Sequence, residues 1–367
     1  MDSIACDLRR FVPGALAPGG RQQFGSIQVR LFEEGDECAV NDGFNAVFSL
    51  RRGLDEWRWK FPPWEGVAVS PRYWIVLAEE VASDALMAQG DAPRPGIVST
   101  TGQALAAVFA ALPMPMQLDG RALLGAQGVD SYSMPAYRCT RAYGRAVEAF
   151  FATFFGDDRV SYFYGYAGER NTQVLTRHYG FDACALAPLW TRGQTSWWLR
   201  SWPVRSHRVR FGFDAAAVDA LWARAAKRYG FSVIRDARWY ARRFGGRPGV
   251  DYLQVSAWRD GRMAACAVLR HTPERIDVAD WLWDGEDTAA IRALDRHVAR
   301  LAAHHGVRQE MWLAGDEALA GALAANGWAP TPLPAPNHLV VRCTRSDVRD
   351  AIANGRHYVT MGDADLV

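Results

Sequence analysis

The 367-residue chain lacks the features by which several protein classes are recognised. Its net charge is only +2, so there is no basic excess to attract a nucleic acid, and no nucleic-acid partner is expected. Its six cysteines are scattered, with no Cys-x-x-Cys pair and no metal-ligand spacing to histidine, so we expect reduced thiols and no metal site. No run approaches the roughly 18 apolar residues of a membrane helix, and the N-terminus lacks the apolar stretch of a signal peptide. We therefore expect a cytoplasmic protein without a membrane span.

The chain is rich in hydrophobic and aromatic residues, which can form a packed core. Hydrophobic residues make up 49% of it and aromatic residues 12%, which excludes an intrinsically disordered protein. At this length two domains are the default expectation. Tryptophans gather at 57–59, 196–202 and 281–283, where they suit either stacking on a sugar or aromatic group, or core packing. Composition does not determine the oligomeric state.

The first half alternates strand and helix patterns. Helical spacing is predicted for 37–53, 54–61, 144–156 and 170–181, and strand patterns for 26–32, 72–80, 160–166, 183–190 and 196–204. Two further strand runs meet at Asp119-Gly120, a dipeptide favoured in type I′ hairpin turns. Residues 81–103 contain several Gly and Pro residues and are predicted to be an inserted loop.

The second half repeats this order of elements. Helices are predicted at 214–230, 236–246, 287–306 and 316–328, and strands at 275–283, 308–314 and 338–343, with a hairpin turning at Asp260-Gly261. A local echo supports the repeat, because Trp57, Trp59, Lys60 and Phe61 match the placing of Tyr240, Arg242, Arg243 and Phe244. We predict a lead at 1–25, a first domain at 26–205, a second domain at 206–345 and a tail at 346–367 without an assigned mechanism.

Together these elements and five short stretches resemble the GNAT superfamily of acyl-coenzyme A-dependent acyltransferases, in tandem and over nearly the whole chain. The stretches are GVDSYSMPAYR, FYGYAGERNTQVLTRHYGF, DARWYARRF, YLQVSAWRDGRMAACAVLR and ALAGALAANGW. The resemblance implies an α/β fold (α+β mixed sheet) with two tandem acyl-CoA N-acyltransferase domains. It also implies acetyl-CoA as the acyl donor and a small-molecule amine as the acceptor.

In this superfamily the fourth strand parts from the fifth, and the donor binds the exposed backbone between them. The resemblance places that backbone at Val129, Asp130, Ser131 and Tyr132. It places the pyrophosphate at the start of the following helix, where free N–H groups and the helix dipole favour an anion. The residues implied there are Arg138, Arg141, Tyr143, Gly144 and Arg145.

This loop departs from the family pattern, which is Gln or Arg, two residues, Gly, one residue, then Gly or Ala. Arg138 fits the first position and Gly144 is taken as the last glycine, but Arg141 stands where the first glycine is expected. Two interpretations stay open. The arginine side chains replace backbone donors to a phosphate, or they form a solvated helix start without a ligand. The equivalent second-half loop contains Asp284, Glu286 and Asp287, which would repel a pyrophosphate, so this domain is predicted to be degenerate and to support the first or bind the acceptor.

Amide formation needs a base for the amine and an acid for the departing thiolate. The candidate base is Asp130, and the candidate acids are Tyr166 and Tyr179. Each has a structural alternative, a hydrogen-bonded strand-end carboxylate for the aspartate and core packing for the tyrosines. His178 is a further candidate base, and Cys139 beside Arg138 lacks the partners of a covalent nucleophile.

The prediction is an N-acetyltransferase acting on a small molecule, an amino sugar or a cell-envelope precursor. The envelope acceptor follows from similarity to the tandem peptidoglycan-bridge aminoacyl transferases. Two alternatives stay open. One is a non-catalytic binding or scaffold protein of the same fold, which the missing loop glycine favours. The other is an aminoacyl transferase using charged transfer RNA, against which the small net charge counts.

Overall fold

The computed structural model describes residues 14–62, 72–81, 96–156, 160–184, 187–193, 207–332 and 337–364. Contacts divide the chain into two compact units. The first unit contains Met1–Met114, Leu124–Gly165 and Val174–Phe181, and the second contains Pro115–Leu123, Tyr166–Gln173 and Asp182–Val367. The strand expected over 196–204 and most of the loop expected over 81–103 lie outside the described residues.

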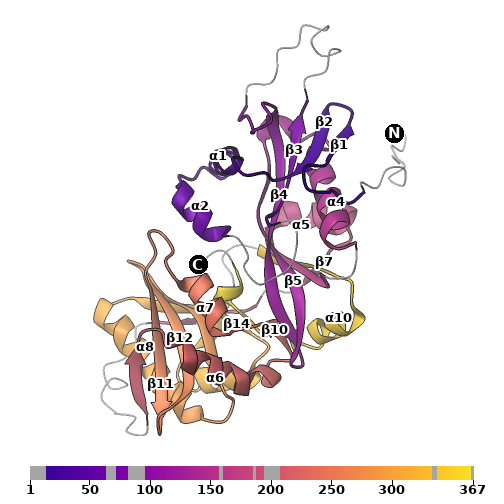
Figure 1. The fold of residues 1–367 in the computed structure, drawn as a ribbon. Coiled ribbons are helices and arrows are strands. Elements are labelled where there is room, and N and C mark those ends of the chain that lie inside the picture. The colour runs from indigo at the N-terminus through magenta and orange to yellow at the C-terminus, as the bar shows by residue number, and fades with distance from the viewer. Residues whose placement is uncertain are drawn as a thin grey trace. The chain divides into compact units, whose positions relative to one another are not determined.

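The strands of the first unit follow the order β1-β2-β3-β4-β5-β6, and the first five are labelled in Figure 1. The strands are β1 (Arg21–Phe24), β2 (Ile27–Leu31), β3 (Trp74–Glu80), β4 (Ala104–Leu118), β5 (Arg121–Ser133) and β6 (Tyr162–Gly168). The helices are α1 (Glu37–Phe48), α2 (Leu54–Lys60), α4 (Ala142–Phe154) and α5 (Glu169–His178). The pairings from β1 to β4 are antiparallel, whereas β5 and β6 are parallel, so the predicted mixed sheet is confirmed.

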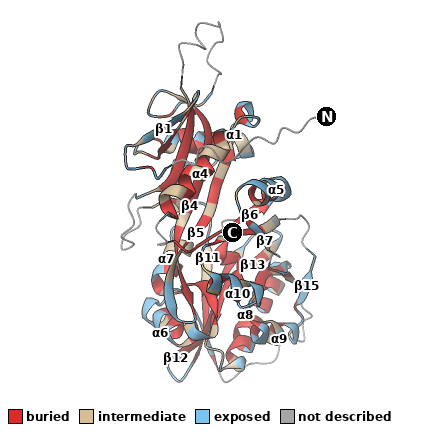
Figure 2. Cartoon of the chain, turned by 90° about the vertical axis from the view of Figure 1, so that its right-hand side faces the viewer, coloured by how far each residue is buried: buried red, intermediate tan, exposed pale blue. Residues whose placement is uncertain are grey.

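Alternation along β3 separates the two faces of this sheet. Ile75 packs into one cluster with Val40 of α1 and Trp57 of α2. Trp74, on the opposite face, stacks on Phe154 of α4 with their ring centroids 4.8 Å apart. Helices α1 and α2 therefore cover one face and α4 the other, and Figure 2 shows the strands as mostly buried.

The second unit contains a sheet with the order β15-β8-β14-β13-β12-β11-β9. Its strands are β8 (Leu189–Arg192), β9 (Arg208–Phe211), β11 (Tyr252–Arg259), β12 (Arg262–His271), β13 (Arg275–Trp283), β14 (Arg308–Ala314) and β15 (Ala329–Thr331). Its helices are α6 (Ala215–Ala225), α7 (Ala237–Phe244), α8 (Thr288–His305), α9 (Glu317–Ala324) and α10 (Ser346–Ala353). Elsewhere in this unit, β16 (Asn337–Cys343) pairs with β7 (Asp182–Cys184), and β10 (Phe231–Val233) pairs with the end of β4.

Both predicted hairpin turns are confirmed. Asp119 and Gly120 have φ angles of 50° and 81°, and Asp260 and Gly261 have φ angles of 51° and 77°. A type I′ turn needs positive φ at both central residues, which aspartate tolerates and glycine adopts freely. Each Asp-Gly pair thus joins two long antiparallel runs.

Four helices of the second unit, α6 to α9, begin at aspartates. Asp214, Asp236, Asp287 and Asp316 are the N-caps of α6, α7, α8 and α9, and each accepts a hydrogen bond from a first-turn backbone N–H. Helix α8 ends at Gly306, whose φ is 69°. These caps satisfy helix-end groups locally, which is why sequence patterns located these helices.

Two parts of the chain form pairings that the sequence pattern does not predict. Strand β8 lies inside the range predicted for the first domain, yet it pairs with β14 and β15 of the second sheet. The tail, predicted without a mechanism, forms α10 and then β17 (Val359–Thr360), which pairs with β14. In the described part of the chain, no helix is both long and apolar enough to cross a bilayer.

Candidate functional site

Strands β5 and β6 part halfway along their length. Their parallel pairing joins Gly125–Gly128 to Tyr162–Gly165, and β5 then continues to Ser133 without a further described pairing to β6. A side chain at Gly128 would run into the ring of Phe163, so this position needs a glycine. The predicted donor segment, from Val129 to Tyr132, begins where the strands separate.

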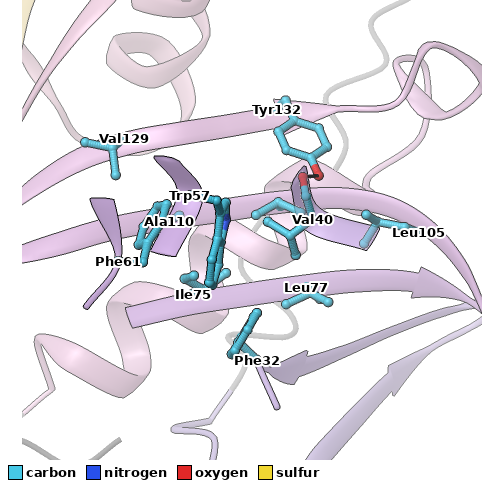
Figure 3. Packing of buried hydrophobic residues seen from close by; sticks show 11 residues of the cluster. Phe32, Val40, Trp57, Phe61, Ile75, Leu77, Leu105, Ala110, Val129 and Tyr132 are labelled. Carbon is cyan, nitrogen blue, oxygen red and sulfur yellow. Dashed lines mark hydrogen bonds between the residues drawn. The ribbon is translucent and has the colours of Figure 1, made fainter. Parts of the chain in front are cut away.

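Beyond this point β5 is irregular at Asp130, whose φ of 47° lies in the left-handed region. Val129 and Tyr132 are three residues apart, yet both enter the core cluster from the same side of the strand (Figure 3). Strict alternation would place them on opposite faces, so the strand carries an extra residue here, as in a β-bulge. The Tyr132 hydroxyl donates to the Val40 carbonyl at 2.8 Å, which anchors the bulge to α1, and burial raises the pKa of Tyr132.

The Asp130 carboxylate is held by two cations. Arg52 donates to Oδ2, and Lys60 Nζ lies 2.5 Å from Oδ1. Arg52 also donates from Nε to Asn41 at 2.8 Å, and its guanidinium lies 4.0 Å above the Phe44 ring. Because both carboxylate oxygens are engaged, the described contacts give Asp130 a positioning role that ties α1 and α2 to the bulge.

The arginine loop precedes α4. Arg138 and Arg141 are exposed, and within the described residues neither has a hydrogen-bond or ion-pair partner for its side chain. Arg141 is the N-cap of α4, makes no side-chain cap, and is followed by a first turn without acidic residues. Arg145 differs, because it pairs with Glu148 at 3.0 Å and lies 4.4 Å over the Phe24 ring. Arg138 and Arg141 are therefore the two positions of this loop where an anion would gain a new partner.

The glycine at position 144 is required by local packing, and the family pattern does not account for it. Counted strictly, the last position of that pattern falls on Tyr143, so assigning Gly144 to it was wrong. A side chain at Gly144 would clash with the Tyr179 hydroxyl, which lies against the first turn of α4. Tyr143 itself packs edge-on against Phe109, with ring centroids 6.0 Å apart.

The two predicted acids have different surroundings. Tyr179 is half-buried, and burial raises the pKa of its hydroxyl with Glu148 adding to the effect and Arg141 and Arg145 opposing it. The unit boundary falls within β6, so that Tyr166, near the end of this strand, belongs to the second unit, where its ring lies 5.3 Å from that of Trp312. His178 and Cys139, the other candidates, are exposed.

In the second unit, the matching gap is filled by the chain itself. Strands β13 and β14 pair only over Arg275–Asp277 and Arg308–Glu310. Past that point β14 pairs with β17, with Leu313 opposite Thr360, and the Tyr358 hydroxyl donates to the Trp281 carbonyl of β13. The tail thus bridges the two strands where they separate.

The start of α8 is likewise closed to an anion. Asp287 accepts from the N–H groups of Ala289 and Ala290, both at 3.1 Å, and also contacts His207 at 2.8 Å. Asp284 accepts from the N–H of Glu286 at 3.1 Å. These contacts give the acidic loop the role of a helix cap.

Sequence reasoning missed a buried polar network around Asp280 of β13. Asp280 also sits at a strand irregularity, because the register with β12 shifts beside it. Arg235 donates to it at 3.0 Å, Thr360 donates to it at 2.7 Å, and Tyr240 donates to its other oxygen. The noted echo could have revealed this network, since Arg235 precedes α7 by the same two residues by which Arg52 precedes α2.

No protein-family model and no curated protein matches the chain. Solved structures do. A GCN5-related N-acetyltransferase from Anabaena variabilis has a TM-score of 0.64 and 11% identity, covering 87% of this chain and 73% of its own. The N-myristoyltransferase of Saccharomyces cerevisiae, with bound myristoyl-CoA, has a TM-score of 0.53 and 11% identity, covering 87% and 83%.

A tandem GNAT protein from the clavulanic acid biosynthesis pathway has a TM-score of 0.51 and 12% identity. Its match covers 86% of this chain and 98% of that one, so the likeness extends over both halves. At such low identity the likeness establishes the fold alone. The chain therefore has the predicted GNAT fold in its tandem form.

Proposed function

We propose that the protein is an acyl-CoA-dependent N-acyltransferase whose donor binds in the first unit. The observation that carries this proposal is the parting of β5 from β6 after Gly128, which leaves the edge of β5 from Val129 to Tyr132 facing a gap. In the second unit the tail pairs with β14 past the point where β14 parts from β13, and its Tyr358 hydroxyl donates to the Trp281 carbonyl of β13. The gap between β5 and β6 is therefore better suited than the gap in the second unit to an extended ligand that forms hydrogen bonds with a strand edge.

The residues present fit a coenzyme A donor in two places. Its thioester would supply an activated acyl carbon beside the bulge at Asp130. Backbone groups of Val129, Ser131 and Tyr132 would hold the pantetheine arm, and Arg138 and Arg141 would contact the phosphates. Arginine suits phosphate because its guanidinium donates two parallel, charge-assisted hydrogen bonds.

Within this frame, Tyr179 is the proposed proton donor to the leaving sulfur. Its raised pKa keeps the hydroxyl protonated, and the hydroxyl lies at the start of α4, the element that would hold the donor's phosphates. Asp130 orients the bulge through Arg52 and Lys60. We propose that Asp130 acts through position, and that the amine loses its proton to water.

We propose acetyl as the acyl group and an amine of a small molecule, amino sugar or cell-envelope precursor as the acceptor. Two solved neighbours support transfer to nitrogen in general, since one is named an N-acetyltransferase and another an N-myristoyltransferase. The latter binds a long-chain donor, so a test of acyl length belongs to the first experiment.

The test is a thiol-release assay with acetyl-, butyryl- and myristoyl-CoA against a panel of amines. We expect amine-dependent release of coenzyme A, and a clear preference among the three acyl chains. Arg138→Ala with Arg141→Ala should raise the KM for the donor, whereas Arg58→Ala on α2 should not. Binding of acetyl-CoA without turnover on any amine would favour the non-catalytic alternative, and no binding at millimolar donor would refute the proposal.

A further inference from the structure

The second unit contains a carboxylate held by the arginine that corresponds to Arg52. Arg235, fully buried, donates from Nε to Asp280 and from Nη1 to the Val233 carbonyl. Its Nη2 donates to Asp363 of the tail at 2.6 Å and to Thr360 at 3.2 Å. The tail thus brings a second carboxylate to a guanidinium that already holds the strand aspartate.

Arg52 also donates to the strand aspartate, but it does so from Nη1, and its Nε donates to Asn41. Its Nη2 is buried without a partner in the described part of the chain. The Arg52 side chain is only 6% exposed. A buried guanidinium N–H without an acceptor is costly, because it has lost water and gained nothing in exchange.

The surrounding charges point to an anionic partner for this group. Among the described residues Arg52 donates to one carboxylate, Asp130, which Lys60 also contacts. In the second unit Arg235 donates to two carboxylates, Asp280 and Asp363. The arginine of the second unit therefore binds two carboxylates, whereas the equivalent arginine of the first unit binds one, which it shares with Lys60.

We propose that the acceptor amine carries a carboxylate, and that this carboxylate binds Arg52 Nη2 as Asp363 binds Arg235. The inference rests on the proposed function, because it concerns the acceptor of the same site. Arg52 holds the bulge at Asp130, so a carboxylate on Arg52 sets its amine beside the strand edge that would carry the thioester. The acceptors in this class are amino acids, amino-aryl acids and carboxylated amino sugars.

The transfer is balanced without a further reactant. The neutral amine nitrogen bonds to the acyl carbon as the carbon–sulfur bond breaks. Tyr179 gives its proton to the sulfur, the amine loses one proton to water, and a proton from water then restores the Tyr179 hydroxyl. The products are an N-acyl amino acid, or its equivalent, and the free thiol. Arg52 keeps its charge throughout and acts by binding.

The first test compares matched acceptors that differ in the carboxylate. The pairs are the amino acids and their amides, 4-aminobenzoate and 4-aminobenzamide, and muramic acid and glucosamine. We expect kcat/KM to favour a carboxylated member by at least tenfold. Equal or better turnover of the neutral members would overturn the inference while leaving the proposed function intact.

The variants must separate recognition from folding. Arg52→Gln with Asp130→Asn removes both charges of the pair, so that no buried carboxylate is left alone, and should abolish the preference for the acid. Arg51→Gln removes a neighbouring exposed arginine and should keep that preference. If the double variant retained the tenfold preference, Arg52 would not be the carboxylate site.

A binding measurement tests the same site without turnover. Each carboxylated amine and its neutral partner would be added to the wild-type chain during thermal unfolding, with acetyl-CoA affinity measured separately by calorimetry. We expect carboxylate-specific stabilisation that the Arg52→Gln, Asp130→Asn variant loses. Absence of stabilisation by every acid, with acetyl-CoA bound, would overturn the inference alone; absence of acetyl-CoA binding would count against the proposed function.

Discussion

The two units share a scaffold and differ in what occupies it. Each has an aspartate at an irregularity of the strand that parts from its neighbour, Asp130 in β5 and Asp280 in β13. Each aspartate is held by an arginine two residues before a helix, Arg52 or Arg235. In the second unit the tail then enters the gap, whereas in the first no described segment does so. The tail therefore fills one of two similar gaps, and the other is left available for a ligand.

The starts of α4 and α8 differ in the same way as the two gaps, since the first is open to an anion and the second is closed. Helix α4 begins with Arg141 and has no acid in its first turn, while α8 begins with an aspartate cap. A side-chain carboxylate at a helix start satisfies the N–H groups that an external anion would otherwise use. Both differences favour the proposal that the donor binds in the first unit.

The largest effect we expect is on stability, from Arg235→Met. The change would leave Asp280 and Asp363 buried without their cation, and breaking a buried pair costs about 3–5 kcal/mol. Urea unfolding should show this loss. Arg51→Met, at an exposed site, should change stability by less than about 0.5 kcal/mol. A small loss for Arg235→Met would mean that the network is not needed to hold the tail.

Donor affinity should respond to the first unit's arginines and not to those near α8. Arg138→Ala with Arg141→Ala should weaken acetyl-CoA binding by about 2 kcal/mol, roughly 30-fold, because charge-assisted hydrogen bonds are lost. Arg259→Ala with Arg262→Ala removes two exposed arginines near the start of α8 and should leave the affinity unchanged. Calorimetry would measure both. The reverse result would move the donor to the second unit.

Acid should loosen the tail. Burial lowers the pKa of His357 from 6.5 to about 3, with repulsion from Arg235 as the smaller cause. A lowered histidine pKa contributes stability that is complete above pH about 6.5 and is lost as pH falls towards about 3. Between pH about 7.5 and 5 the loss should be about 1–2 kcal/mol.

Urea unfolding at both pH values would test this, with His357→Gln as the variant that removes the titrating group. The difference between wild type and variant should shrink at low pH. A pH dependence identical in the two proteins would show that His357 does not titrate in this window.

The smallest effect concerns the hairpins, in which the two units agree. Gly120→Ala and Gly261→Ala each place a Cβ at positive φ, where the strain costs about 1–2 kcal/mol. Neither glycine has a close neighbour that a methyl group would hit. Thermal unfolding should therefore give similar losses, and a loss several times larger at one turn would break the equivalence.

Elements fixed by local chemistry could be predicted from the sequence. The Asp-Gly hairpin at 119–120 and the cap at Asp287 each depend on one or two neighbouring residues. The resemblance also implies a parting of two strands at Val129, and the pairing of β5 with β6 ends at the preceding residue, Gly128.

Pairings over long sequence separations could not be predicted. The bond between Arg52 and Asp130 spans 78 residues, and that between Arg235 and Asp363 spans 128. The strand pattern shows the carboxylate of Asp130 but not its partners, so the sequence alone predicts a base there. The sequence predicts no role for the tail, because its polar residues find their partners only after the second sheet has formed.

The most direct test of where the donor binds is hydrogen exchange of the backbone with and without acetyl-CoA. The account predicts slower exchange in 125–145, which covers the free edge of β5 and the start of α4, and unchanged exchange in 275–290 and 308–316. Protection of the second-unit segments, or of neither unit at saturating acetyl-CoA, would contradict it.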